Sequence, residues 1–307
     1  MKGKMKMKKL TYIINLLLLA AITTNAQQSE FPKLIGLYFG QKPPEDKPVL
    51  FAPGYISCGI DHCSPSFNPD GKEIYFELLD KNEIAKIGYT KLVQGIWSKP
   101  DTIPFCKNNS FISGNPFITP DGKKMFFTSF RPGSVSEYKE NIWCSERTSK
   151  GWSNPKPVSA NVNKMRIHWS ISVSNSGTLF FQGNKIDKSE EGGIYFSKLI
   201  NGKYAKPVRM GSEINSGRSV TCPYVSPDES YIIFTRMGTG PQDSGIFISF
   251  KDKTGNWIPA VMLEGGTKEK GGMSPKITPD GKYLFYVNGG IWWMPIAKII
   301  EELRPKE

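Results

Sequence analysis

Five segments of the chain repeat one pattern of apolar and polar residues. In each, a short apolar stretch runs into a polar turn, and an aromatic or β-branched stretch follows the turn. The first copy reads Ser64-Pro65-Ser66-Phe67-Asn68-Pro69-Asp70-Gly71 and continues into Ile74-Tyr75-Phe76. The five turn residues are separated by 51, 55, 52 and 52 residues, and they are Asp70, Asp121, Ser176, Asp228 and Asp280. A period of this length predicts a repeat fold.

The residues of each copy predict a β-hairpin. Proline presets φ at the first central turn position, aspartate can bond its own backbone two residues on, and glycine tolerates positive φ. A third strand should follow each hairpin, and then a fourth that opens with an aromatic residue and carries a proline, as at Trp97 and Pro100. Proline suits an outer edge because it cannot donate to a central ladder. Each copy therefore predicts one four-stranded blade of a β-propeller.

The spacing also predicts how the ring closes. The fifth copy reaches the end of the chain without a fourth strand, and Pro48 lies one period before Pro100. We therefore expect residues 48–53 to supply the outer strand of the last blade, which removes an open sheet edge. The predicted fold class is all-β: a five-bladed β-propeller of four-stranded antiparallel blades over residues 48–297, closed by an N-terminal outer strand.

The two ends of the chain follow other patterns. Five lysines within the first nine residues precede the short apolar run 12–22, and small residues lead up to Ala26. This pattern predicts a signal peptide over residues 1–26, and thus a periplasmic or secreted protein with no transmembrane segment after cleavage. Residues 27–47 should form an N-terminal arm. In the tail 298–307, helical spacing of Ile299, Ile300 and Leu303 predicts a short helix packed on the side of the propeller.

Charge and cysteine content narrow the expected partners. The net charge of +12 falls to about +7 without the predicted leader, which favours an acidic partner such as an anionic glycan or a cell-envelope polymer. A solvated basic surface is the alternative. Nucleic acid is not expected as a partner of an exported chain, and a monomer is expected. The cysteines number five, so at least one thiol stays unpaired, and one disulfide is allowed.

At this point the chain resembles a known family. The Pro-Asp-Gly hairpins, the segment Gly95-Ile96-Trp97-Ser98-Lys99-Pro100 and the segment Glu213-Ile214-Asn215-Ser216 look like TolB-type, WD40-like propeller repeats, which are abundant in exported proteins of Bacteroidetes-like bacteria. The resemblance covers nearly the whole mature chain. It implies the propeller fold, but its members include binding scaffolds, envelope proteins and sugar-active enzymes. TolB has a separate amino-terminal domain, which residues 27–47 are too short to form, so no Tol role follows.

A candidate site lies at the face we call the channel-mouth face, formed by the loops that enter the innermost strands and those between second and third strands. Both histidines, His62 and His168, occur eight residues before a turn residue, so they should point towards one axis. They could bind a divalent metal or an anionic sugar, with Asp61 orienting His62. The alternative is that both bond water or backbone. No other metal or cofactor is expected.

Polar and aromatic residues accompany the histidines on this predicted face. They are Asn109, Arg131, Arg166, Trp169, Arg218 and Arg236. Arginine can grip a carboxylate with two parallel hydrogen bonds, and an indole ring can stack on a sugar. These residues suit an acidic saccharide, or they are solvated loop residues. The turn aspartates should be structural.

Two functions remain open at this stage. We expect a non-catalytic binding or scaffold propeller that recognises a glycan, a peptide or an envelope protein. The alternative is a carbohydrate-active lyase or glycosidase acting on an acidic glycan. A glycosidase needs two carboxylates beside the scissile bond, and only Asp61 is readily placed near the channel mouth.

Overall fold

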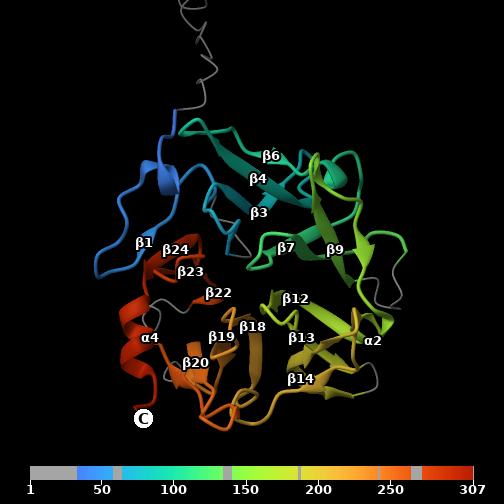
Figure 1. Ribbon diagram of the computed structural model, residues 1–307, viewed down its shortest axis with the longest axis vertical. Helices are drawn as coiled ribbons and strands as arrows, with labels where there is room; N and C mark the ends of the chain where they lie inside the picture. The colour runs from blue at the N-terminus through green and yellow to red at the C-terminus, as the bar shows by residue number, and fades with distance from the viewer. Residues whose placement is uncertain are drawn as a thin grey trace, which may run out of the picture. The chain divides into compact units, whose positions relative to one another are not determined.

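Five antiparallel sheets are arranged in a ring around a central axis in the computed structural model (Figure 1). The structure describes residues 33–57, 64–133, 140–185, 188–240, 243–263 and 272–306. For residues 167–169, 185 and 188–191 it describes the backbone alone. The residues from Ile35 onward make one compact unit, and the description below concerns that unit. The five-bladed propeller predicted from the repeats is confirmed.

In each blade the strands follow chain order from the axis outward, except that the outer strand of blade 5 is β1. Blade 1 contains β2 (Ser66–Phe67), β3 (Glu73–Leu79), β4 (Ala85–Val93), β5 (Ile96–Trp97) and β6 (Asp101–Thr102). Blade 2 contains β7 (Ser113–Ile118), β8 (Lys124–Ser129), β9 (Asn141–Thr148), β10 (Gly151–Trp152) and β11 (Lys156–Pro157). Blade 3 contains β12 (Arg166–Val173), β13 (Leu179–Lys185), β14 (Lys188–Ser197) and β17 (Val208–Arg209), with the hairpin β15 (Leu199–Ile200) and β16 (Lys203–Tyr204) between the last two.

The last two blades have four strands each. Blade 4 contains β18 (Ser219–Val225), β19 (Tyr231–Met237), β20 (Gly245–Phe250) and β21 (Val261–Met262). Blade 5 contains β22 (Met273–Ile277), β23 (Tyr283–Val287), β24 (Ile291–Pro295) and β1 (Val49–Leu50). Short helical segments connect or flank the blades: η1 (Leu37–Gly40), η2 (Pro104–Cys106), α2 (Ala160–Asn163) and α4 (Ala297–Leu303).

Ring closure follows the prediction. Val49 pairs with Trp293 and Leu50 with Trp292, and the backbone N–H of Phe51 donates to the carbonyl of Ile291 at 2.7 Å. In Figure 1 the blue strand β1 lies beside the red strand β24. Phe51 is fully buried, with its ring 4.8 Å from that of Phe285 and 5.3 Å from that of Trp293. The amino-terminal segment is therefore both an outer strand and part of the core.

The position of the outer-strand aromatic residue differs from the prediction. Trp97 does not open the outer strand; it pairs with Leu92 in a narrow hairpin that extends β4, and the outer strand β6 begins only after Pro100. Trp152 and Tyr204 lie in equivalent hairpins. Trp152 and Tyr204 pack on Tyr75 and Phe126 of the preceding blade, whereas Trp97 packs on Phe39 of the amino-terminal segment. Trp152 and Tyr204 therefore seal contacts between blades.

The polar turns form as their residues dictate. The Oδ1 atoms of Asp70, Asp121, Asp228 and Asp280 each accept a hydrogen bond from the backbone N–H two residues on, at 2.9 to 3.1 Å. These carboxylates are occupied within their own turns, as expected for structural residues.

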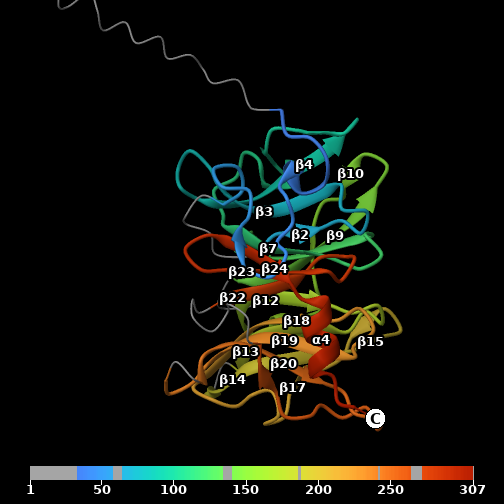
Figure 2. The same cartoon turned by 90° about the vertical axis from the view of Figure 1, so that its left-hand side faces the viewer.

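The predicted tail helix is present as α4. Ile300 belongs to the main hydrophobic core, and Ile299 and Leu303 pack against it. Figures 1 and 2 both place α4 beside β20 of blade 4. The helix thus covers the interface between blades 4 and 5.

Candidate functional site

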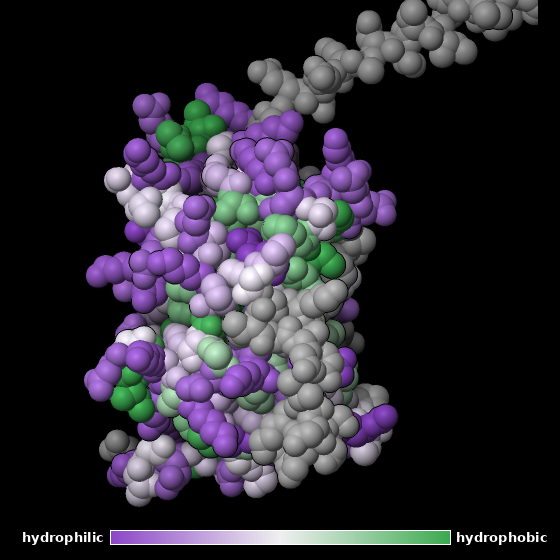
Figure 3. Space-filling model, turned by 90° about the vertical axis from the view of Figure 1, so that its right-hand side faces the viewer, coloured by the Kyte–Doolittle hydropathy of each residue, from purple (hydrophilic) through white to green (hydrophobic). Residues whose placement is uncertain are grey.

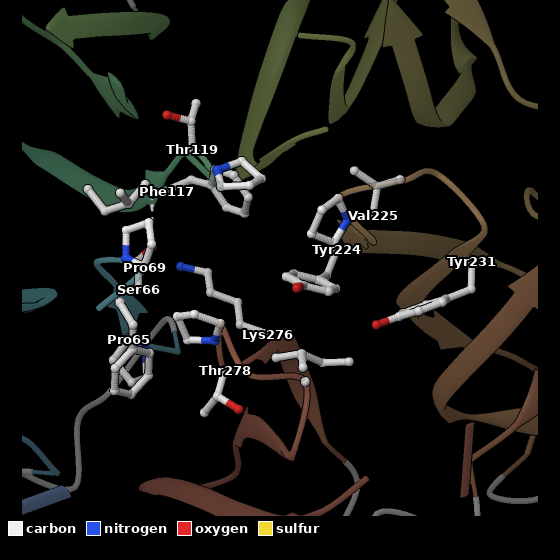
Figure 4. A pocket seen from close by; sticks show the side chains of 17 residues that line it. Pro65, Ser66, Pro69, Phe117, Thr119, Tyr224, Val225, Tyr231, Lys276 and Thr278 are labelled. Atoms are coloured by element: carbon white, nitrogen blue, oxygen red, sulfur yellow. Dashed lines mark hydrogen bonds between the residues drawn. The ribbon is translucent and has the colours of Figure 1, made fainter. Parts of the chain in front are cut away.

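The clearest candidate site is a cavity of about 180 Å³ at the end of the axis where the Pro-Asp-Gly turns lie. We call it the axial cavity. Its wall includes four aromatic rings, those of Phe67, Phe117, Tyr224 and Tyr231, and Figure 4 shows Phe117, Tyr224 and Tyr231. The lining also includes four turn prolines, which we call the rim: Pro69, Pro120, Pro227 and Pro279. Among the described residues, its lining includes no histidine, cysteine or carboxylate side chain. The lining therefore offers apolar contacts and a few polar atoms.

Lys276 places an ammonium group at the base of this cavity. The residue lies on β22 and is 9% exposed. Its Nζ donates to the carbonyl oxygens of Ser64 at 2.8 Å and Pro116 at 2.9 Å. Figure 4 shows the side chain extending between Ser66 and Phe117. Because Ser64 precedes β2 and Pro116 belongs to β7, this one side chain ties blades 5, 1 and 2 together across the axis.

The hydroxyl groups of the lining serve the fold. Ser66 Oγ accepts from the backbone N–H of Ile118 at 2.9 Å. Thr119 Oγ1 donates to Asp121 at 2.6 Å, and Thr278 Oγ1 donates to Asp280 at 2.6 Å. Burial raises the pKa of the Tyr224 phenol well above its ordinary value, so this hydroxyl stays protonated. Three of the lining hydroxyls, those of Ser66, Thr119 and Thr278, are therefore already engaged within the fold.

Asn109, predicted as a binding residue, holds the fold in the structure. Its Oδ1 and its backbone carbonyl both accept from the Nζ of Lys86 at 2.9 Å, and its Nδ2 donates to the carbonyl of Phe105 at 3.2 Å. Asn163 and Asn215 play a similar part in blades 2 and 3, where each exchanges hydrogen bonds with the backbone of a third strand. Asn109 thus has a structural role with partners of its own, since Asn163 and Asn215 each lie 13 residues before a turn residue and correspond in sequence to Asn108.

Arg131 and Arg236 both lie over aromatic rings. Arg131 is buried, and its guanidinium lies 5.0 Å from the ring centre of Phe127 and 5.2 Å from that of Trp143. The guanidinium of Arg236 lies 4.0 Å from the ring centre of Phe247. Burial lowers the pKa of both arginines, but each remains charged near neutrality. Arg131 also lies over the rings of Phe105 and Phe111, which belong to the connection between blades 1 and 2.

The other predicted residues are only partly described. Arg166 and Arg218 are both exposed. Arg166 begins β12 and Arg218 immediately precedes β18, so the two residues lie at the start of the inner strands of neighbouring blades. Asp61 and His62 lie outside the described residues, as do the side chains of His168 and Trp169. A metal ion shared by the two imidazoles thus remains a prediction.

The described part of the chain contains three free thiols and no grouping of metal ligands. There, no group of three or more His, Cys, Asp and Glu side chains is placed to hold a metal ion. Cys106, Cys144 and Cys222 are free thiols, while Cys58 and Cys63 are outside the described residues. Burial raises the pKa of the Cys144 thiol to about 11, so it is protonated at neutral pH.

Residues of the axial cavity escaped the sequence analysis. The position four residues before each turn residue holds Ser66, Phe117, Ser172, Tyr224 and Lys276. Counting back four, instead of eight, would have gathered these inward-facing side chains. All but Ser172 line the axial cavity. Serine occupies two of the five positions and phenylalanine, tyrosine and lysine the others, so no shared residue type marks them.

Comparisons with known proteins identify the fold. No family model matches the chain, and no curated protein matches it. Among solved structures, the TolB structure from Agrobacterium tumefaciens superposes with a TM-score of 0.51 at 17% identity, covering 86% of this chain and 84% of that one.

Two further structures are similar at a lower level. TolB from Acinetobacter baumannii has a TM-score of 0.45 at 18% identity, over 76% of this chain and 54% of that chain, so the match spans about half of that protein. Hydrazine synthase from Kuenenia stuttgartiensis has a TM-score of 0.48 at 14% identity, over 76% and 37%. In the described part of the chain, no helix has the length and apolar character to cross a bilayer. In its fold, the chain is a five-bladed β-propeller that is similar to the TolB structure from Agrobacterium tumefaciens.

Proposed function

We propose that this protein is an exported, non-catalytic binding or scaffold module that recognises a peptide segment of a cell-envelope protein. The observation that carries the proposal is the axial cavity, with its proline rim, its four aromatic rings and the ammonium of Lys276 at its base. Concave, mainly apolar sites with a few placed polar groups are typical of ligand binding. Export rests on the leader pattern of residues 1–26.

The chemistry of the cavity favours a peptide over a sugar. A saccharide presents many hydroxyl groups, each of which needs a partner when it is buried. The hydroxyls of Ser66, Thr119 and Thr278 already make hydrogen bonds within the fold. Prolines and aromatic rings offer close contact to an apolar side chain with little loss of conformational entropy. An apolar peptide side chain inserted between the rim prolines therefore fits the lining best.

Binding at the channel-mouth face, through Arg166, Arg218 and the two histidines, stays a prediction of the sequence analysis. The axial cavity lies at the opposite end of the propeller, at the Pro-Asp-Gly turns. The two sites share no residue, so substitutions at one site test it without changing the other.

A peptide selection tests the proposal. A random peptide phage library would be selected on the protein without residues 1–26, and one selected peptide would be titrated by fluorescence anisotropy. Replacing Pro69, Pro227 and Pro279 by alanine removes exposed rim contacts, and we expect affinity to fall about tenfold or more, which is about 1.4 kcal/mol. The matched control replaces Pro100 and Pro155, which precede outer strands, and should bind as the unchanged protein does.

Two results would contradict the proposal. One is a peptide affinity that the rim replacements leave unchanged. The other is specific binding on a parallel glycan array that is lost on changing His62 and His168 to alanine, which would favour the channel-mouth face and a sugar ligand.

A further inference from the structure

The interfaces between neighbouring blades, which we call seams, are filled by different groups. At the seam between blades 1 and 2, Arg147 forms an ion pair with Glu73, and its guanidinium lies 4.2 Å from the ring centre of Trp152. Trp152 Nε1 in turn donates to the hydroxyl of Tyr75 at 3.0 Å. An ion pair and two aromatic rings thus close this seam.

Three other seams also have fillers. Between blades 3 and 4, Glu229 accepts hydrogen bonds from Ser174 and Ser176 at 2.7 Å and pairs with Lys251 at 3.0 Å. Between blades 4 and 5, α4 lies over the seam, with Arg304 5.3 Å from the ring centre of Phe250. Between blades 5 and 1, the rings of Tyr38 and Phe39 pack on Trp293 and Trp97.

The seam between blades 2 and 3 lacks these fillers among the described residues. The positions equivalent to Glu73, Tyr75, Arg147 and Trp152 hold Lys124, Phe126, Leu199 and Tyr204. Lys124 faces Glu146 of its own blade at 3.8 Å, so no ion pair crosses this seam in the described part of the chain. The smaller ring of Tyr204 takes the place of an indole. A cavity of about 580 Å³ remains there.

Apolar side chains form the walls of this seam cavity, and cations stand at its edge. The walls include Phe126, Val158, Val173, Leu199 and Tyr204. Lys156 and Lys203 are exposed at the edge, with no ion pair to a described residue. The two carboxylates of the lining are occupied, because Asp121 bonds within its turn and Glu146 faces Lys124. Figure 3 views the molecule from the side of β9 and α2, where small apolar patches lie between hydrophilic ones.

We propose that the seam between blades 2 and 3 is a second binding site, which takes a small anionic amphiphile with an apolar body of about two rings. The volume lies within the range of small-molecule sites, roughly 300 to 1,000 Å³. The apolar body occupies the space that an indole and an arginine fill at the seam between blades 1 and 2. The anionic head lies between Lys156 and Lys203, where opposite charge favours it.

A matched pair of fluorescent probes tests the site. Both 1-anilinonaphthalene-8-sulfonate and N-phenyl-1-naphthylamine have the same aromatic body, but only the first carries an anionic group. The double variant Lys156→Gln, Lys203→Gln should weaken binding of the sulfonate three- to tenfold at low salt and leave the uncharged probe unaffected. The control Lys99→Gln, Lys253→Gln removes the same charge from exposed lysines of blades 1 and 4 and should change neither.

Filling the cavity tests its location. Tyr204→Trp restores the residue found at the two equivalent hairpins, and both probes should then bind at least tenfold more weakly. Val261→Trp adds an indole on the exposed edge of blade 4 and serves as the control. Near-ultraviolet circular dichroism and the melting temperature establish that each variant is folded.

Unchanged affinity of both probes for a folded Tyr204→Trp variant would overturn the site. Equal loss of sulfonate binding in the two lysine pairs would overturn the anionic ligand class.

Discussion

Buried ammonium groups are bonded to backbone carbonyls at two points of the propeller. Lys86 is 2% exposed and donates to Asn109 Oδ1 and to the carbonyls of Asn109 and Phe111 at 2.8 to 2.9 Å. Lys276 does the same for carbonyls of two blades across the axis. A loop carbonyl facing the interior needs a donor, and a lysine can reach three of them at once. These lysines act as connectors of loops and blades.

Lys86→Met tests this at the residue scale. The variant keeps an apolar stem but leaves three acceptors without their donor, so the free energy of unfolding should fall by about 1–3 kcal/mol. Urea denaturation followed by tryptophan fluorescence measures it. Lys81→Met, at an exposed position nearby, is the control and should change stability by less than about 0.5 kcal/mol. Equal stability of the two variants would contradict the connector role.

Glu229 makes the stability depend on pH. Burial alone would raise the pKa of this carboxyl, but hydrogen bonds from Ser176, Ser174 and Lys251 outweigh burial and lower it to about 2. Because the folded-state pKa lies below the unfolded value, the stabilisation is present above about pH 4.5 and is lost as the pH falls towards 2. After allowance for partial solvent exposure, it amounts to about 1–2 kcal/mol.

Urea titrations between pH 2 and 6 check this prediction. Glu229→Gln should lower stability at pH 6 and should lose less stability than the original protein as the pH falls. Identical pH profiles of the two proteins would show that the carboxylate contributes nothing at this seam.

At the element scale, the packing of one aromatic side chain, Phe51, stabilises the closing strand β1 more than its short backbone pairing does. Strand β1 pairs over two residues only, yet Phe51 beside it is fully buried against Phe285 and Trp293. Phe51→Ala should cost about 3–5 kcal/mol of unfolding free energy, because it deletes a buried ring. Val49→Ala, at a position that is 39% exposed on β1 itself, should cost less than about 1 kcal/mol. Similar losses in both variants would mean that strand pairing dominates.

The blades and their closure were predictable because their signals are local. Four of the five hairpin turns contain Pro-Asp, three of them followed by Gly, and a nearly fixed period counts the copies. The hairpin location of Trp97 was not predictable in this way, since nothing in Gly95-Ile96-Trp97 distinguishes an outer strand from an extension of the third strand. The seams depend on which side chains meet across two blades. That pairing appears only when the repeats are laid in register.

The candidate site was less accessible to the sequence. Asn109 was predicted as a binding residue, and in the structure its side chain bonds Lys86 and the carbonyl of Phe105. Lys276 and Tyr224 carried no signal, because the inward position changes residue type from blade to blade. A ring of repeats places unlike side chains around one axis, and their joint chemistry depends on the closed fold.

At the scale of the whole molecule, stability depends on closing the ring. Without residues 1–53, β24 would present an open edge, and open edges pair with other chains. We expect a protein beginning at Gly54 to elute as dimers or larger species in size-exclusion chromatography and to melt at lower temperature than one beginning at Gln27. A monodisperse monomer with an unchanged melting temperature would contradict this.

The pairing of β1 with β24 also affects the order of folding. A ribosome makes Trp293 244 residues after Val49 (293 − 49), so the two partners meet only when all five blades have been made. Early domains of many proteins fold during synthesis, but here the opening segment has nothing to join until the last blade emerges. Strand β1 therefore stays unpaired until β24 of the last blade has been made. This delay suits a polypeptide whose leader pattern predicts passage through a narrow translocation pore.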